Sequence, residues 1–490
     1  MKKLKLFFAT LIAVIFAFSG AKVMAYDITV NDGNGEYETY QIFTGTLSED
    51  KKTLSNIKWG NGITEDGQKA LQDKYGVSSA ADLAEVLGAS DFTAEQAKQF
   101  AKAAGQYLQN PGVLTGLAAG YYLIQNKSVS ANETYTNFIL EVVKDVEVEP
   151  KADTPTFEKK VKDTNDTTGE TTDWQDSADY DINDSVPFQL TATLPSNFTT
   201  YDHYYLEITD SLSAGLTYNS DAKVYLVNGD SKTDVTSSFT VAADGSSYVI
   251  NDLRTISGAT DGLQIVVEYT ATLNEKAVIG SKGNPNTAKL IYSNNPNNTG
   301  NGTTKPEDTT ETPEDTVIVF TYKVVVNKVD QNNDALAGAG FTLYKKVNGD
   351  WKEVQAISAD EATAAENSDK KNIFTFSGLD DGDYKLSETP TPDGYNSIDD
   401  VTFTVTATHD IESDNPALTS LSGDAASGEL TFTANQSEGS LTTDVQNKKG
   451  AVLPSTGGKG TTLLYVLGTG LILVAGILLV TKKRVDSKTK

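Results

Sequence analysis

The 490-residue sequence contains no cysteine and only two histidines, His203 and His409. Without cysteine the chain cannot form a disulfide bond. The histidines lie far apart in the sequence, so histidine-based catalysis and zinc ligation are poorly supported, and we expect both rings to be solvated at the surface. We therefore expect neither a metal ion nor a cofactor.

Positive charge is also scarce. Lysine and arginine together number 40, against 67 aspartate and glutamate residues, which gives a net charge of -27 and a pI near 4.4. Such a protein repels the phosphates of nucleic acids and the headgroups of anionic lipids. Neither is an expected partner.

The first 25 residues have the features of a secretory signal peptide. Residues 1–25 begin with lysines, continue with an apolar stretch from Leu6 to Phe18, and end with small residues at Val23 and Ala25. The mature chain is therefore predicted to begin near Tyr26. An exported protein of this length without disulfides must obtain its rigidity from large cores or from other covalent chemistry.

The C-terminal segment, residues 451–490, combines a pentapeptide, an apolar run over 461–480 and a basic tail over 481–490. A run of about twenty apolar residues spans a bilayer, and a cationic tail behind it stays on the cytoplasmic side. The precursor is thus expected to pause in the membrane. The pentapeptide is Leu453, Pro454, Ser455, Thr456 and Gly457.

Residues 26–152 are predicted to form an α+β domain. Thr93 and Gln96 suit a helix-capping box, and apolar residues follow them at helical spacing; a shorter helix is predicted to begin at Ser79. Strands are expected around these helices. Their expected ranges are 26–30, 37–44, 120–125 and 138–148.

The rest of the exported chain is predicted to be mainly β. Residues 153–296 and 317–450 contain short alternating strands separated by Gly, Asn, Asp and Ser turns, which is typical of β-sandwiches. Residues 297–316 contain almost no apolar side chains, so we expect an extended linker there. The expected fold is a pair of tandem sandwiches after an α+β domain.

Each sandwich places polar residues on the inward face of a strand. Side chains of equal parity share a face, so a polar residue within an apolar set of the same parity is directed inward. Each domain thereby offers an inward lysine, an inward acid and an inward asparagine. The sets are Phe157, Lys159, Val161; Tyr204, Leu206, Ile208, Asp210; Asn286, Ala288, Leu290, Tyr292; Tyr322, Val324, Val326, Lys328; Tyr384, Leu386, Glu388; and Val445, Asn447.

Buried lysine, acid and asparagine form a reactive combination. Burial disfavours the charged forms, which lowers the pKa of the lysine and raises the pKa of the acid. A neutral amine held against a carboxamide can attack its carbonyl carbon, while the protonated acid bonds the carbonyl oxygen and relays protons to leaving ammonia. The product is an intramolecular isopeptide bond.

The sequence resembles the backbone, or major, pilins of sortase-assembled Gram-positive pili over nearly the whole exported chain. The pentapeptide, apolar run and basic tail resemble a cell-wall sorting signal. The resemblance implies Ig-like, CNA-type sandwiches, with a CNA-B/SpaA-like domain last. The other segments that carry it are 155–161, 286–296, 336–343 and the E-box-like Tyr384-Lys385-Leu386-Ser387-Glu388-Thr389-Pro390.

The resemblance also implies roles for the inward polar residues. Lys159 is expected to bond Asn286 with Asp210 as the helper acid. Lys160 and Lys162 compete with Lys159, and only strand parity separates them. The last domain is expected to bond Lys328 to Asn447, with Glu388 as helper. The alternatives are buried salt bridges or exposed strand ends.

Polymerisation is the second property that the resemblance implies. A sortase would cleave between Thr456 and Gly457 and pass the Thr456 carbonyl to an amine of the next subunit. Lys151, in the segment Val146 to Lys151, resembles the pilin acceptor lysine, although this family often has an aromatic residue where Glu149 stands. An ordinary solvated linker lysine is the alternative. The implied partners are a pilus-specific and a housekeeping sortase, further copies of the chain, minor pilins and peptidoglycan.

Two other classes of protein remain open. A monomeric wall-anchored adhesin would share the sorting signal and isopeptide bonds but would not require Lys151. A wall-bound hydrolase should display a nucleophile with a base or a pair of carboxylates, and no such group stands out. Asp330, Asn332 and Asp334 suggest a calcium loop only weakly, and a polar turn is the preferred interpretation. A third cross-link in the first domain is left open.

Overall fold

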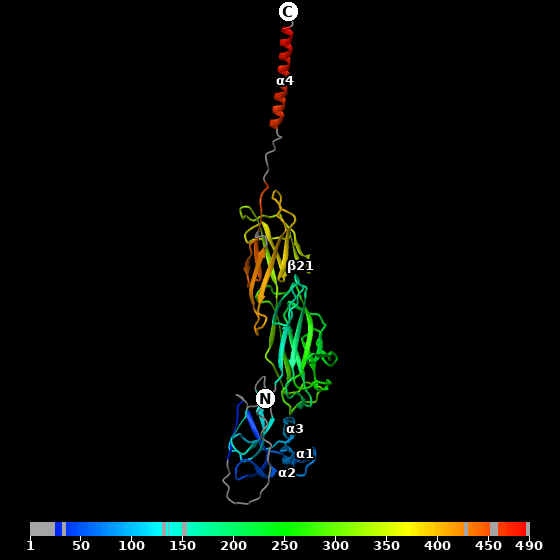
Figure 1. The fold of residues 1–490 in the computed structure, drawn as a ribbon, viewed down its shortest axis with the longest axis vertical. Helices are drawn as coiled ribbons and strands as arrows, with labels where there is room; N and C mark the ends of the chain where they lie inside the picture. Colours follow the sequence, from blue (N-terminus) through cyan, green and yellow to red (C-terminus); the bar gives the residue numbers. More distant parts are fainter. Residues whose placement is uncertain are drawn as a thin grey trace.

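The computed structural model describes residues 25–31, 36–129, 134–135, 137–148, 154–425, 430–450 and 459–486. These residues form three domains that follow one another along the long axis of the molecule, with a separate C-terminal helix at one end (Figure 1). The predicted signal peptide up to residue 24, the predicted acceptor Lys151 and the pentapeptide 453–457 lie outside the described residues.

The first domain packs helices against a four-stranded antiparallel sheet of order β3-β2-β4-β5, while β1 pairs in parallel with β6. Apolar side chains from helices and sheet, including Phe43, Leu71, Leu83 and Phe100, share one core. The elements are β1 (Ile28–Val30), β2 (Glu36–Leu47), β3 (Leu54–Trp59), α1 (Glu65–Tyr75), α2 (Ala80–Leu87), α3 (Ala94–Gly105), β4 (Gly120–Ser128), β5 (Asn137–Val142) and β6 (Val146–Val148).

The predicted helix starts in this domain are confirmed. Thr93 and Gln96 form a reciprocal capping box at the start of α3, and the side chain of Ser79 caps α2. The expected strand over 138–148 is divided into β5 and β6. Helix α1 and strand β3 were not predicted.

The middle domain is a sandwich of two sheets. One sheet has the order β14-β15-β10-β17-β19-β8 with β18 attached to β17, and the other has the order β13-β12-β16-β9-β7 with β11 attached to β16. The strands are β7 (Thr156–Val161), β8 (Ser177–Asp179), β9 (Ser185–Thr193), β10 (Leu206–Leu212), β11 (Leu216–Tyr218), β12 (Lys223–Asn228), β13 (Ser231–Asp234), β14 (Thr240–Val241), β15 (Ser247–Ile250), β16 (Gln264–Leu273), β17 (Asn284–Ser293), β18 (Thr309–Glu311) and β19 (Asp315–Phe320).

The linker predicted over 297–316 is wrong for its second half. Strand β18 pairs with β17 through main-chain hydrogen bonds, which need no apolar side chains. Strand β19 starts at Asp315 and pairs with both β17 and β8, and its Val317 and Val319 lie in the middle-domain core. The middle domain therefore extends to about residue 319, beyond the predicted boundary.

The last domain is a second sandwich with five strands in each sheet, in the orders β23-β24-β20-β29-β28 and β22-β21-β25-β26-β27. Its strands are β20 (Tyr322–Asp330), β21 (Phe341–Val347), β22 (Asp350–Ile357), β23 (Thr363–Ala364), β24 (Lys371–Leu379), β25 (Gly382–Glu388), β26 (Val401–His409), β27 (Leu418–Ala425), β28 (Thr433–Asn435) and β29 (Ser440–Asn447). The first and last long strands, β20 and β29, lie side by side in parallel.

The C-terminal helix α4 (Lys459–Asp486) contains the predicted membrane segment. Its residues from Leu464 to Lys482 are apolar enough to cross a bilayer, and none of that stretch is buried against the rest of the protein. Figure 1 shows α4 extending away from the three domains.

Candidate cross-linking sites

In the last domain Lys328 and Asn447 meet inside the core. They lie on the neighbouring parallel strands β20 and β29, in the register that pairs Lys328 with Val445. The Lys328 ammonium donates one hydrogen bond to the Asn447 carboxamide oxygen at 2.7 Å and another to the Val445 carbonyl at 2.8 Å. Both side chains are fully buried. The parity prediction for this pair is confirmed.

Glu388 approaches the same pair from the opposite sheet, on strand β25. Its two carboxylate oxygens accept hydrogen bonds from the Asn447 amide nitrogen at 2.9 and 3.0 Å, and one of them lies 3.5 Å from the Lys328 nitrogen. Burial lowers the pKa of Lys328 below its ordinary value, and the Glu388 carboxylate opposes that shift. The three groups can therefore exchange a proton and bring an amine against a carboxamide.

In the middle domain Lys159 points from the edge strand β7 into the core and meets Asp210, on β10 of the facing sheet. The ammonium nitrogen lies 2.8 Å from the Asp210 carboxylate, and both side chains are fully buried. The rings of Phe188 and Tyr269 also contact the ammonium. Burial lowers the pKa of Lys159, while Asp210 acts in the opposite direction.

The hydroxyl of Tyr269 connects Lys159 to Asn286. It accepts hydrogen bonds from the Lys159 nitrogen at 3.2 Å and from the Asn286 amide nitrogen at 2.7 Å, and it donates to Asp210 at 2.5 Å. The Asn286 carboxamide oxygen is buried and accepts no hydrogen bond. The predicted triad is thus assembled, with Tyr269 as a fourth member.

Burial distinguishes Lys159 from its neighbours Lys160 and Lys162 as the candidate cross-linking lysine. Lys160 points to the other face of β7 and forms ion pairs with Glu158 and Asp176. Lys162 lies beyond the strand, with its ammonium over the ring of Trp174. Lys159 is the only one of the three that is buried in the core, as its parity predicted.

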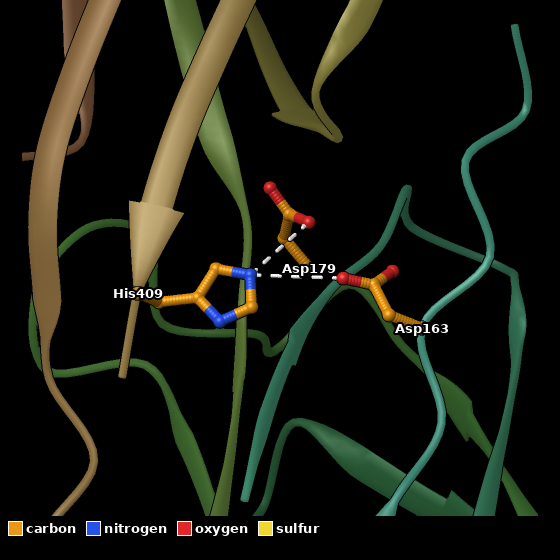
Figure 2. A group of neighbouring side chains, drawn as sticks. All are labelled: Asp163, Asp179 and His409. Carbon is orange, nitrogen blue, oxygen red and sulfur yellow. Dashed lines mark ion pairs between the residues drawn. The ribbon is translucent and has the colours of Figure 1, made fainter. Parts of the chain in front are cut away.

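The prediction that both histidines are solvated is wrong. The side chain of His409 is only 9% exposed and lies at the junction between the middle and last domains, where its ring nitrogen is 3.6 Å from Asp163 and 3.7 Å from Asp179 (Figure 2). Burial alone would disfavour its charged form, but its interactions with the two carboxylates raise its pKa to about 9. His203 is partly exposed and pairs with Asp252 at 2.7 Å. Each histidine pairs with aspartates that are distant in the sequence, and this ion pairing accounts for the location of both side chains.

The polar-turn interpretation of residues 330–334 agrees with the structure. One carboxylate oxygen of Asp330 accepts hydrogen bonds from the backbone nitrogens of Asn332 and Asp334 at 2.8 and 3.0 Å. The turn therefore uses that carboxylate oxygen internally.

The first domain offers no matching cross-linking group among the residues that the structure describes. No described lysine of that domain is buried. Lys102, on α3, instead pairs with Asp202 of the middle domain at 2.8 Å. The described part of this domain thus lacks the buried amine that the reaction requires.

Two residues were missed at the level of sequence. Tyr269 shares parity with the inward residues Ile265 and Val267, and no role in the cross-linking group was predicted for it. Lys345 shares parity with the buried residues Phe341 and Leu343 and is itself buried. Strand parity was the signal that could have identified both.

Comparisons with known proteins agree with this architecture. Residues 182–296 match the Cna-B-like domain of the Gram-positive pilin backbone subunit 2 family, and residues 322–416 match a prealbumin-like fold domain. Residues 445–487 match the LPXTG cell wall anchor motif. The three matches therefore follow the order of the structure: the middle sandwich, the last sandwich and then the C-terminal anchor.

Whole-chain relatives cover the first domain as well. The trypsin-resistant surface T6 protein of Streptococcus pyogenes serotype M6 is 24% identical over 93% of this chain and 94% of its own length. The solved T6 backbone pilin of serotype M6 S. pyogenes matches with a TM-score of 0.56 at 17% identity, covering 89% of this chain and all of that one. The major pilin SpaD of Corynebacterium diphtheriae gives a TM-score of 0.45 at 16% identity, over 87% and 97%. Together, the domain matches, the LPXTG anchor and the near full-length relative support a Gram-positive backbone, or major, pilin.

Proposed function

We propose that this backbone pilin, a shaft subunit of a pilus on the cell wall, is stiffened by two self-formed isopeptide bonds and joined to its neighbours by a third amide. The bonds within the subunit link Lys159 to Asn286 and Lys328 to Asn447. The observation that carries the proposal is the Lys328 amine at 2.7 Å from the Asn447 carboxamide, with Glu388 on the amide nitrogen.

The reaction in the last domain is a transamidation. The Lys328 ammonium gives a proton to Glu388, and the neutral amine attacks the carboxamide carbon of Asn447. The protonated acid lies against the amide nitrogen, so it can relay protons to that leaving group. A proton from the attacking nitrogen then reaches the amide nitrogen, the carbon–nitrogen bond of the amide breaks, and ammonia leaves. One new amide forms for each ammonia released.

The middle domain would use the same chemistry with one more participant. Asp210 takes the proton of the Lys159 ammonium, and the Tyr269 hydroxyl contacts both the attacking nitrogen and the leaving nitrogen. Burial and the Asp210 carboxylate raise the pKa of Tyr269, so its hydroxyl keeps its proton. Tyr269 can therefore give that proton to the leaving nitrogen while it accepts another from the amine.

Such bonds suit a protein that must resist tension. In the last domain the bond joins strands whose residues are separated by 119 positions, so almost the whole domain becomes one covalent loop. A loop of this length is expected to stabilise the fold by about 4 kcal/mol, by analogy with disulfides. Pulling force would pass through the bond, and reductants would not break it.

Polymerisation would join the Thr456 carbonyl of one subunit to the Lys151 amine of the next. A head-to-tail contact between different surfaces does not close on itself and produces a filament. A pilus-specific sortase would catalyse this step, and a housekeeping sortase would attach the finished shaft to peptidoglycan. The chain itself is no enzyme in this proposal, because its self-crosslinking occurs once.

Peptide mapping of purified pili tests the intermolecular bond. Protease digestion should release a branched peptide in which the Thr456 carbonyl is attached to the Lys151 side chain. A branch on a different lysine would contradict the assignment of Lys151. Subunits that carry Thr456 only on peptidoglycan, with no branched peptide, would instead support a monomeric adhesin.

A further inference from the structure

The candidate reactive lysine of the middle domain lies on an edge strand. Among the described strands, β7 forms a ladder with β9 alone, so its other side is the open edge of the sheet. Asn286 lies on β17, in the facing sheet. In the last domain, by contrast, Lys328 and Asn447 lie on neighbouring strands of one sheet, in a register set by main-chain pairing. In the described chain, no such pairing places Lys159 against Asn286.

A carboxylate on β19 binds the main chain of Lys159 at this open edge. The backbone N–H of Lys159 donates a hydrogen bond to the Asp315 carboxylate at 2.6 Å. Lys159 is fully buried, so an N–H without an acceptor would be unfavourable there. Two residues further along the same edge, the N–H of Val161 donates to the Gln175 carbonyl. Asp315 therefore holds the edge of β7 at the reactive residue itself.

Asp315 is in register with the helper acid of the same domain. Ala288, on β17, pairs with Asp315 on one side and with Asp210 on the other. Residues directly opposite each other on neighbouring strands point to the same face of a sheet, so both carboxylates are directed toward the sheet that contains β7. Asp210 contacts the Lys159 ammonium at 2.8 Å, while Asp315 contacts its backbone nitrogen. The two carboxylates therefore hold the lysine at both ends.

We propose that Asp315 is a positioning residue for the cross-link between Lys159 and Asn286. Asp315 fixes the Lys159 backbone relative to β19. Strand β19 in turn pairs with β17, in the register that places Val317 opposite Asn286. The hydrogen bond thus connects the strand of the amine to the strand of the carboxamide across the open side of the sandwich. A displacement of about 1 Å can slow a reaction about a hundredfold. This role rests on the proposed function, because it requires that the isopeptide bond forms.

The charge of Asp315 also acts on the amine. Burial lowers the pKa of Lys159, and the carboxylates of Asp210 and Asp315 both oppose that shift. Burial raises the pKa of Asp315 itself, while the hydrogen bond from the Lys159 backbone acts in the opposite direction. The substitution Asp315→Asn keeps an oxygen that can accept this hydrogen bond but removes the charge. It therefore separates the positioning effect from the electrostatic effect.

Peptide mapping over time, after cell-free synthesis of the full-length chain in detergent, measures the two cross-links separately. We expect Asp315→Ala to slow formation of the Lys159–Asn286 bond at least tenfold, because β7 loses its acceptor at the reactive residue. The bond in the last domain should form at the unmodified rate and is the internal reference. Glu314→Ala, at the exposed neighbouring position, is the matched control and should change neither rate. Asp315→Leu also lacks an acceptor but fills more of the space, and it replaces the alanine variant if that variant does not fold.

Asp315→Asn provides the rescue. It should restore most of the rate, because an oxygen again accepts the Lys159 N–H. The loss of negative charge should lower the pKa of Lys159 and move its pH–rate profile to lower pH. Asp210 on β10 and Tyr269 on β16 face the same amine and are unchanged in this variant. A residue that only stabilised the fold would not move the profile.

Three results would contradict this role. A folded Asp315→Ala or Asp315→Leu chain that forms the middle-domain bond at the unmodified rate would overturn it. Equal slowing by Asp315→Asn and Asp315→Ala would also overturn it, because the acceptor oxygen would then be irrelevant. An unmodified chain that never forms the Lys159–Asn286 bond would instead contradict the proposed function of the middle domain, and the positioning role with it.

Discussion

The Lys328 amine and the Asn447 carboxamide oxygen are 2.7 Å apart on neighbouring parallel strands, with no water-accessible surface on either side chain. An unmodified lysine in that position would leave a buried charge beside a single carboxylate, an arrangement that costs several kcal/mol unless it is well compensated. Conversion to an amide removes both the charge and the unfavourable burial. The same reasoning applies to Lys159 in the middle domain.

Replacing the helper acid should stop the reaction in the last domain. We expect Glu388→Ala to retain one more ammonia than the unmodified chain, because no group remains to accept the Lys328 proton. Loss of the covalent loop should lower the free energy of unfolding by about 4 kcal/mol. Intact mass and denaturant unfolding provide the two measurements. Glu353→Ala, at an exposed position of β22, should change neither, and a fully cross-linked Glu388→Ala chain would show that the acid is dispensable.

Tyr269→Phe tests the hydroxyl that bridges the two nitrogens of the middle domain. The ring remains in the core, but the proton relay is lost, so cross-linking of Lys159 to Asn286 should slow roughly a hundredfold or more. A time course of intact mass after synthesis measures this rate. Tyr248→Phe is the matched control, because the buried Tyr248 hydroxyl makes no hydrogen bond to Lys159, Asp210 or Asn286 and its ring lies 6.3 Å from that of Tyr269. Equal rates in both variants would assign Tyr269 a packing role only.

The acceptor lysine can be tested in cells. Lys151→Ala should abolish the high-mass ladders that survive boiling in detergent, while the monomer is still produced and anchored through Thr456. Immunoblots of wall extracts provide the measurement. Lys74→Ala, an exposed lysine on α1, should leave the ladders intact. Ladders that persist in the Lys151→Ala strain would exclude this residue as the acceptor.

Removing the buried cation of the domain junction should destabilise it strongly. We expect Lys345→Met to lower the free energy of unfolding by about 3 to 5 kcal/mol, because Asp166, Asp181 and Asp380 would lose the ammonium that they share. Lys346→Met removes only a half-exposed ion pair, 3.5 Å from Asp383, which is worth less than about 1 kcal/mol. Denaturant unfolding compares the two, and equal effects would show that the buried cluster adds no stability.

Strand parity explains why the cross-linking residues could be predicted from the sequence. The alternation around Lys159 and Lys328 follows from the two-residue repeat of a strand, which holds regardless of how the strands are arranged. Helix caps at Ser79 and Thr93 were equally local features. Predictions that depend on a few neighbouring residues were therefore the successful ones.

The junction could not be predicted, because it depends on how two domains stack. Lys345 and Asp181 are separated by 164 positions, and nothing near either residue in the sequence indicates that they meet. His409 was assigned to the surface for the same reason. Strand β18 was missed because its pairing uses main-chain groups, which leave no apolar pattern in the sequence.

The intact mass of the mature subunit tests the central claim most directly. Two isopeptide bonds predict a mass lower than that of the sequence by two ammonia molecules, and peptide mapping should place one loss at Lys159–Asn286 and the other at Lys328–Asn447. A folded subunit with the full, unmodified mass would contradict the account.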